Sequence, residues 1–172
     1  MRLTVFTDYA LRVLLVLGTR REGLVTIAEV SDAFDISETH LMKVANTLAH
    51  RGWIETVRGR GGGMRLAIDP TRLSLRKVVE TLENDFSLVE CFGDNDRCLL
   101  TGGCGLERAL ARALRAFYEE LDRHTLADLV AGSSLLKAVT PRVPAFPAGR
   151  ATGRRLPLLN WNPPCHFDGI GH

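Results

Sequence analysis

The 172-residue chain lacks most features that would reveal a function at once. Its formal net charge is only +2, so a nucleic-acid partner would have to be held by a local basic patch. The uncharged run Val13–Gly18 near the N-terminus is far too short to span a bilayer, and no small-residue cleavage site follows it. Catalytic acid–base pairs, phosphate loops and nucleophile motifs are missing. We therefore expect a cytoplasmic protein that is not an enzyme.

Proline is nearly absent from the first four-fifths of the chain. Only Pro70 precedes residue 140, and the other six prolines follow it together with several glycines. This composition predicts a largely disordered tail over residues 132–172, which also holds a Cys165–His166 pair that we expect to be inert. The rest has an ordinary globular composition, 45 % hydrophobic and 24 % charged, so it can form a core without disulfides.

The N-terminal part of the chain shows a succession of helical patterns. Apolar residues recur at helical spacing over residues 4–17, and leucines on the opposite face make this helix apolar nearly all round. We expect its second face to meet a partner subunit. Next, Thr26 and Glu29 form a Thr-x-x-Glu capping box, and Ser37 can begin another helix that Gly52 ends.

A basic hairpin follows these helices. The stretch WIETVRGRGGGMRLAI alternates as two short strands around a glycine-rich turn. Helix, turn, helix and hairpin in this order predict a mainly α protein with a winged helix-turn-helix DNA-binding domain over residues 1–70. The second helix would enter the major groove, and the hairpin would reach phosphates or the minor groove, although a solvated polar face is the alternative for any single residue. The candidate DNA contacts are Thr39, His40 and Lys43 on the helix, and Arg58, Arg60 and Arg65 on the hairpin.

The remaining helical patterns predict a dimer. Residues 71–88 form a connecting helix capped by Ser74, and residues 106–131 a long dimerisation helix, with Thr125 indicating a short final helix near its end. No later element of the chain could cover the apolar stripe of the long helix, which favours a homodimer. Such a dimer would contact two half-sites of a near-palindromic operator, about 34–36 Å apart. The stripe consists of Leu106, Leu110, Ala113, Leu114, Phe117 and Leu121.

Three of the four cysteines, Cys91, Cys98 and Cys104, share the glycine-rich segment 89–105 with the spacing C-x6-C-x5-C. A disulfide framework would leave an odd cysteine in a reducing compartment, and structural zinc sites usually contain C-x2-C pairs. Zinc held by three thiolates and one other ligand stays open, as do three unligated thiols. An iron–sulfur cluster fits better, because thiolates hold such clusters and the nearby glycines let backbone N–H groups approach the cluster sulfurs. The positive end of the long helix, at Cys104, would offset cluster charge.

Four segments resemble, in order, the Rrf2 family of winged-helix regulators over roughly residues 1–131. They are LTVFTDYALRVLL, TIAEVSDAFDISETHLMKV, RGRGGGMRLA and the three-cysteine segment. The resemblance is greater to the nitric-oxide-sensing NsrR branch than to the related IscR branch. One departure is Met64, which stands where the family hairpin usually has an aromatic residue.

The resemblance implies a homodimeric repressor with one cluster per subunit on the three cysteines, [4Fe–4S] favoured over [2Fe–2S]. Nitric oxide would break the cluster down, release the DNA and derepress nitric-oxide detoxification genes. Two alternatives stay open, an IscR-type regulator that senses iron–sulfur status or oxygen, and a zinc-stabilised DNA-binding module.

Three cysteines leave the cluster one ligand short. IscR-like members carry a histidine where this chain has Glu107, so we look for an oxygen ligand. We favour Asp8, which could come from the other subunit, because a carboxylate on a helix expected to be buried needs a partner. An ion pair with Arg12 is the alternative that the spacing permits. A carboxylate is a poor match for iron beside thiolates, so its site would be open to a small ligand. The other candidates are Glu90, Asp94, Asp96 and Glu107.

Overall fold

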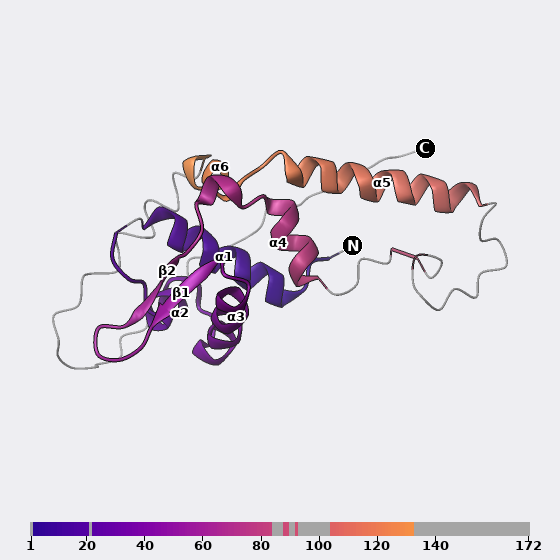
Figure 1. Ribbon diagram of the computed structural model, residues 1–172. Coiled ribbons are helices and arrows are strands. Elements are labelled where there is room, and N and C mark those ends of the chain that lie inside the picture. Colours follow the sequence, from indigo (N-terminus) through magenta and orange to yellow (C-terminus); the bar gives the residue numbers. More distant parts are fainter. Residues whose placement is uncertain (1, 21, 84–87, 90–91, 93–103, 133–172) are drawn as a thin grey trace.

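The computed structural model describes residues 2–20, 22–83, 88–89, 92 and 104–132. This part of the chain is mainly helical, with one small antiparallel sheet (Figure 1). None of its helices is long and apolar enough to cross a membrane. In chain order the elements are α1 (Val5–Thr19), α2 (Ile27–Phe34), α3 (Glu38–His50), β1 (Ile54–Val57), β2 (Gly63–Leu66), the 3₁₀ turn η1 (Pro70–Arg72), α4 (Leu75–Leu82), α5 (Gly105–Asp122) and α6 (Leu126–Gly132).

Side-chain caps fix where the N-terminal helices begin. Thr26 and Glu29 form the predicted capping box at α2, with Glu29 N–H donating to Thr26 Oγ1 at 3.2 Å. Ser37 caps α3 and Ser74 caps α4, which confirms both expectations. Between α2 and α3, Asp35 adopts a left-handed conformation with φ of 53° and turns the chain sharply. Helix, tight turn and helix therefore follow from local sequence.

The hairpin forms where the alternation predicts it. β1 and β2 pair antiparallel, with Ile54 opposite Leu66 and Val57 opposite Gly63. A side chain at Gly62 would collide with the carbonyl oxygen of Val57, so the turn closes only around a residue without a Cβ atom. The glycines of the hairpin tip are thus required by its geometry.

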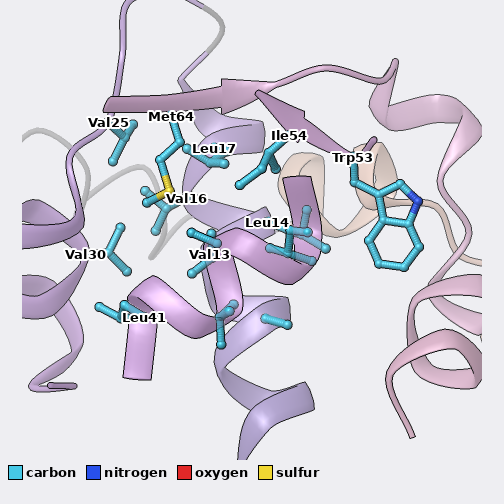
Figure 2. Packing of buried hydrophobic residues seen from close by; sticks show 14 of the residues in the cluster. Val13, Leu14, Val16, Leu17, Val25, Val30, Leu41, Trp53, Ile54 and Met64 are labelled. Carbon is cyan, nitrogen blue, oxygen red and sulfur yellow. The ribbon is translucent and has the colours of Figure 1, made fainter. Parts of the chain in front are cut away.

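Helix α1 lies at the centre of the core. It contacts α3, α4, α6 and β2, and its buried residues include Val13, Leu14 and Leu17. Figure 2 shows Met64 pointing from β2 into the core beside Val16 and Leu17, so a thioether fills the position where the sequence lacks the usual aromatic ring. Elements of the same chain therefore cover most of the apolar surface of α1. No partner subunit is needed to explain most of the burial of this helix.

The C-terminal helices differ in how they pack. No residue of α5 is buried in the described chain, and its N-terminal half projects away from the other helices in Figure 1. α6 instead folds back onto α1 and η1. Two backbone hydrogen bonds hold this return, from Leu75 N–H to the His124 carbonyl at 2.8 Å and from Leu126 N–H to the Leu73 carbonyl at 2.9 Å. The long helix predicted over residues 106–131 is interrupted in the structure, because α5 ends at Asp122 and α6 begins at Leu126 after the turn at Thr125. Dimerisation through α5 stays a prediction.

The contact between α1 and α6 requires a small residue at position 18. A Cβ atom on Gly18 would lie 2.7 Å from Cγ2 of Val130, a stiff β-branched side chain. We expect Gly18→Ala to lower the free energy of unfolding by roughly 1 kcal/mol, because overpacking outweighs the gain in helix propensity. Urea unfolding would measure the change.

A matched pair of variants separates this clash from a general effect of alanine. Gly105 has no atom within 4 Å of an added Cβ, so Gly105→Ala should change stability little. In a Val130→Ala background, Gly18→Ala should lose most of its cost. An equal cost in both backgrounds would show that the close approach is unimportant.

Candidate DNA interface and metal site

One face of α3 is available to a partner. Leu41, Val44, Ala45 and Leu48 are buried in the core, and the helix presents polar residues on its other side. Thr39 and Lys43 are both exposed there, one turn apart. Lys43 takes part in none of the ion pairs formed within the described residues. The N-terminal half of α3 therefore offers a hydroxyl and a free cation in the position from which recognition helices read DNA.

His40 is exposed but lies against neighbouring elements. Its ring centroid is 6.2 Å from that of Tyr9 on α1, and its Nδ1 lies 2.9 Å from Ser37 Oγ. The side chain is thus held at the edge of the outward face. Its ring contact with Tyr9 connects the start of α3 to α1, and His40 remains accessible to a partner.

The hairpin places three arginines in two different environments. Arg58 and Arg60 are exposed in the turn and form no ion pair within the described part of the chain. Arg65, on β2, stands opposite Glu55 in the strand register and forms a salt bridge with it. The strand register pairs the two side chains, which our reading of the sequence missed because it treated the hairpin arginines one by one. Arg58 and Arg60 are therefore the stronger candidates for phosphate contacts.

The sequence suggested that Asp8 is buried, but in the structure it is not. Its side chain is 46 % exposed and forms a salt bridge of 2.8 Å with Arg12, one turn further along α1. Arg12 also lies over the ring of Phe34 on α2, with its Cζ atom 5.6 Å from the ring centroid. The ion pair that the spacing permitted is therefore present. The carboxylate remains accessible, and an exposed i, i+4 pair of this kind is worth only about 0.3–0.5 kcal/mol.

The end of α4 is tied to the first turn of α1. The Glu83 carboxylate accepts hydrogen bonds from the Thr4 backbone N–H at 2.8 Å and from Thr4 Oγ1 at 3.1 Å. The Thr4 carbonyl in turn accepts from the Asp8 N–H at 3.1 Å. Since Glu83 is eight residues before Cys91, this contact connects the chain that leads into the cysteine segment with the helix turn that carries Asp8.

Of the three clustered cysteines, only Cys104 lies among the described residues. It is the N-cap residue of α5, half-buried, unpaired and without a side-chain capping hydrogen bond. Its thiol is therefore free to bind a metal at the positive end of a helix. Cys91 and Cys98 lie outside the described residues, as do Glu90, Asp94 and Asp96. Glu107 lies in the first turn of α5.

Within the described ranges alone, no group of three or more His, Cys, Asp or Glu side chains is placed to hold a metal ion. The thiol of Cys104 is a suitable ligand for an iron–sulfur cluster, and the accessible carboxylate of Asp8 is a weaker oxygen ligand beside it. The other two expected ligands fall in the segment that the structure does not describe. The donor chemistry of Cys104 and Asp8 therefore fits the expected cluster.

Contacts between α4 and α5 set the direction of the long helix. Arg76 on α4 forms a salt bridge of 2.9 Å with Glu80, and its Cζ atom lies 5.4 Å from the centre of the Tyr118 ring on α5. Partial burial raises the pKa of the Tyr118 phenol, and the nearby charge of Glu80 adds to the increase. The phenol therefore stays neutral and packs as an amphipathic ring between the two helices.

Comparison with known proteins relates this chain to transcriptional regulators. Residues 3–132 match the Rrf2 family, described as iron-dependent transcriptional regulators. The transcriptional regulator NsrR of Bacillus subtilis is 46 % identical over 132 residues, which cover 76 % of this chain and 90 % of that protein. NsrR of Geobacillus kaustophilus is 47 % identical over 141 residues, or 81 % of this chain and 96 % of that protein. The oxidised form of Staphylococcus aureus CymR has a similar fold, with a TM-score of 0.65 at 19 % identity over 78 % of this chain and 99 % of that chain.

Proposed function

Since the chain belongs to the Rrf2 family of transcriptional regulators and is NsrR-like, we propose that it is a repressor that senses nitric oxide through an iron–sulfur cluster. Nitric oxide would end its binding to operator DNA and derepress genes for nitric-oxide detoxification. The observation that carries this proposal is the identity of 46–47 % to regulators named NsrR over most of the chain. Those relatives are transcriptional regulators, which agrees with the expectation that the chain is not an enzyme.

The DNA-binding part of the proposal rests on the exposed cations of α3 and the hairpin. Thr39 and Lys43 would contact base edges or phosphates from the major groove, with His40 at the edge of the same surface. Arg58 and Arg60 would meet phosphates or the minor groove beside it. Arg65 would contribute only after leaving Glu55. Two subunits joined through α5 would place two such surfaces on a near-palindromic operator.

The cofactor part of the proposal assigns Cys91, Cys98 and Cys104 as cluster ligands, with Asp8 of either subunit as the fourth and [4Fe–4S] as the favoured type. A bound cluster supplies irons that react with nitric oxide. Both carboxylate oxygens of Asp8 contact Arg12, at 3.2 Å from Nε and 2.8 Å from a terminal guanidinium nitrogen. Binding to iron would therefore compete with this ion pair and loosen the arginine that lies over Phe34. The position of Asp8 would then bias the helix-turn-helix through α1, a two-state arrangement with different affinities for DNA.

The first test is an absorption spectrum of the full-length protein purified without oxygen, before and after addition of nitric oxide. We expect a brown protein whose cluster band changes after a few equivalents. A brown protein that responds to oxygen but is indifferent to nitric oxide would favour an IscR-type regulator. A protein that stays colourless after reconstitution with iron and sulfide would overturn the cofactor assignment and leave zinc or bare thiols.

Asp8 and Arg12 can be tested separately because only one of them can bind iron. We expect Asp8→Ala to give a cluster with an altered spectrum or poorer retention, whereas Arg12→Ala removes the same ion pair and leaves the carboxylate in place. Since the pair stabilises the fold by only about 0.3–0.5 kcal/mol, both variants should remain folded. If both variants keep the wild-type spectrum and iron content, Asp8 is not a ligand.

A further inference from the structure

The outward face of α3 is polar except for one hydrophobic residue, Met42. Met42 is 50 % exposed, and it is the single large hydrophobic residue of α3 that reaches solvent to this extent. It follows Thr39 by three residues and precedes Asn46 by four, so the three side chains form one ridge along the helix surface. Thr39 and Asn46 are also exposed. An apolar side chain thus lies within the polar surface that is proposed to face DNA.

The major groove offers one apolar group to such a side chain. Thymine carries a 5-methyl group there, and the other base edges present hydrogen-bond donors and acceptors. Methionine is unbranched and polarizable, so its side chain can adapt to a methyl group on an irregular surface. Cytosine has only a hydrogen at that position, so thymine offers Met42 the largest apolar surface of the four bases to remove from water together with its own.

Asn46 indicates the same base pair. A side-chain amide can pair with N6 and N7 of adenine, the base opposite thymine. Four residues of helix span about 6 Å, less than two base-pair steps of about 3.4 Å each. Met42 and Asn46 can therefore reach the same base pair or two adjacent ones, and together they match an A·T pair.

We propose that Met42 is a specificity-determining residue of α3, which selects thymine at one position of each half-site by packing on its 5-methyl group. The inference rests on the proposed DNA-binding function and adds the base and the chemical group that are read. Thr39 and Lys43 would fix the helix in the groove, and Met42 would select sequence within it.

The test uses full-length protein purified without oxygen and duplex DNA selected by that protein from a randomised pool. In the selected duplex, each thymine is replaced in turn by uracil, which pairs identically but lacks the 5-methyl group. At one position per half-site we expect wild-type binding to weaken about fourfold, the effect of exposing one methyl-sized group. Met42→Ala should bind that duplex equally well with thymine or uracil, and Met42→Leu should still prefer thymine.

Lys43→Ala is the matched control, because it changes the next residue of the same exposed face. It should weaken binding to both duplexes and keep the preference for thymine. A thymine preference that persists unchanged in Met42→Ala, or wild-type protein that responds to uracil at no position, would overturn the inference and leave the DNA-binding proposal intact. If wild-type protein enriches no sequence from the pool, the DNA-binding proposal fails together with the inference.

Discussion

Replacing Cys104 by alanine is expected to leave the protein without a stable iron–sulfur cluster. Cys104 begins α5 with its thiol free, and its side chain makes no capping hydrogen bond whose loss would weaken the helix. Mutation of a residue that hydrogen-bonds to a metal ligand typically reduces metal affinity by roughly 10- to 100-fold, and loss of a ligand itself should reduce it by more. Iron and acid-labile sulfide, measured on protein purified without oxygen, would both fall close to zero.

Cys165→Ala is the matched control for this change. It removes a thiol from the proline-rich tail, which lies beyond residues 3–132 that match the family. We expect wild-type iron and sulfide content in this variant, and the same loss as in Cys104→Ala for Cys91→Ala and Cys98→Ala. Full cluster content in Cys104→Ala would show that Cys104 is not a ligand, and full content in all three variants would show that the clustered thiols do not hold the metal. Zinc in place of iron in the wild-type protein would favour the zinc-stabilised module.

DNA binding is expected to weaken steeply with salt. If Lys43, Arg58, Arg60 and Arg65 of both subunits each neutralise one phosphate, a plot of log K against log salt has a slope of about −7. If Arg65 stays paired with Glu55, the slope is about −5. Between 50 and 200 mM salt the affinity would fall by roughly 10³- to 10⁴-fold. Fluorescence anisotropy on the selected duplex would measure it.

Single arginine variants show where this dependence originates. Arg60→Ala removes one exposed cation per subunit from the hairpin turn, so the slope should become shallower by roughly 2 for the dimer. Arg112→Ala removes an equally exposed cation from α5 and should leave the slope unchanged. Equal effects of the two changes, or a flat salt response of the wild-type protein, would contradict the proposed interface.

Local chemistry explains why much of the fold could be predicted. The capping residues Thr26, Ser37 and Ser74 begin helices where their side chains can accept a backbone N–H within three residues, a property that short sequence windows contain. The alternation around RGRGGG likewise predicts a hairpin, because side chains of a strand point to opposite faces. Such signals depend on neighbours in the chain and need no knowledge of distant contacts.

The candidate site was predicted less completely, because its geometry depends on contacts between residues that are distant in the sequence. The sequence suggested a buried Asp8 because α1 is apolar nearly all round, but burial depends on which elements cover each face. In the structure Asp8 lies at a half-exposed position beside Arg12. The contact between Glu83 and Thr4 joins residues 79 positions apart, so no local pattern indicates it. The three cysteines were visible as a group only because they are close in sequence.

By itself, then, the sequence determined the helices, the hairpin, the polar face of α3 and the set of thiols, since each follows from spacing along the chain. Only the tertiary structure decided that α6 returns to cover α1 beside Gly18, that Arg65 is paired while Arg60 is free, and that the first turn of α1 is joined to the end of α4. These outcomes depend on which surfaces exclude water together, and many distant residues determine that jointly.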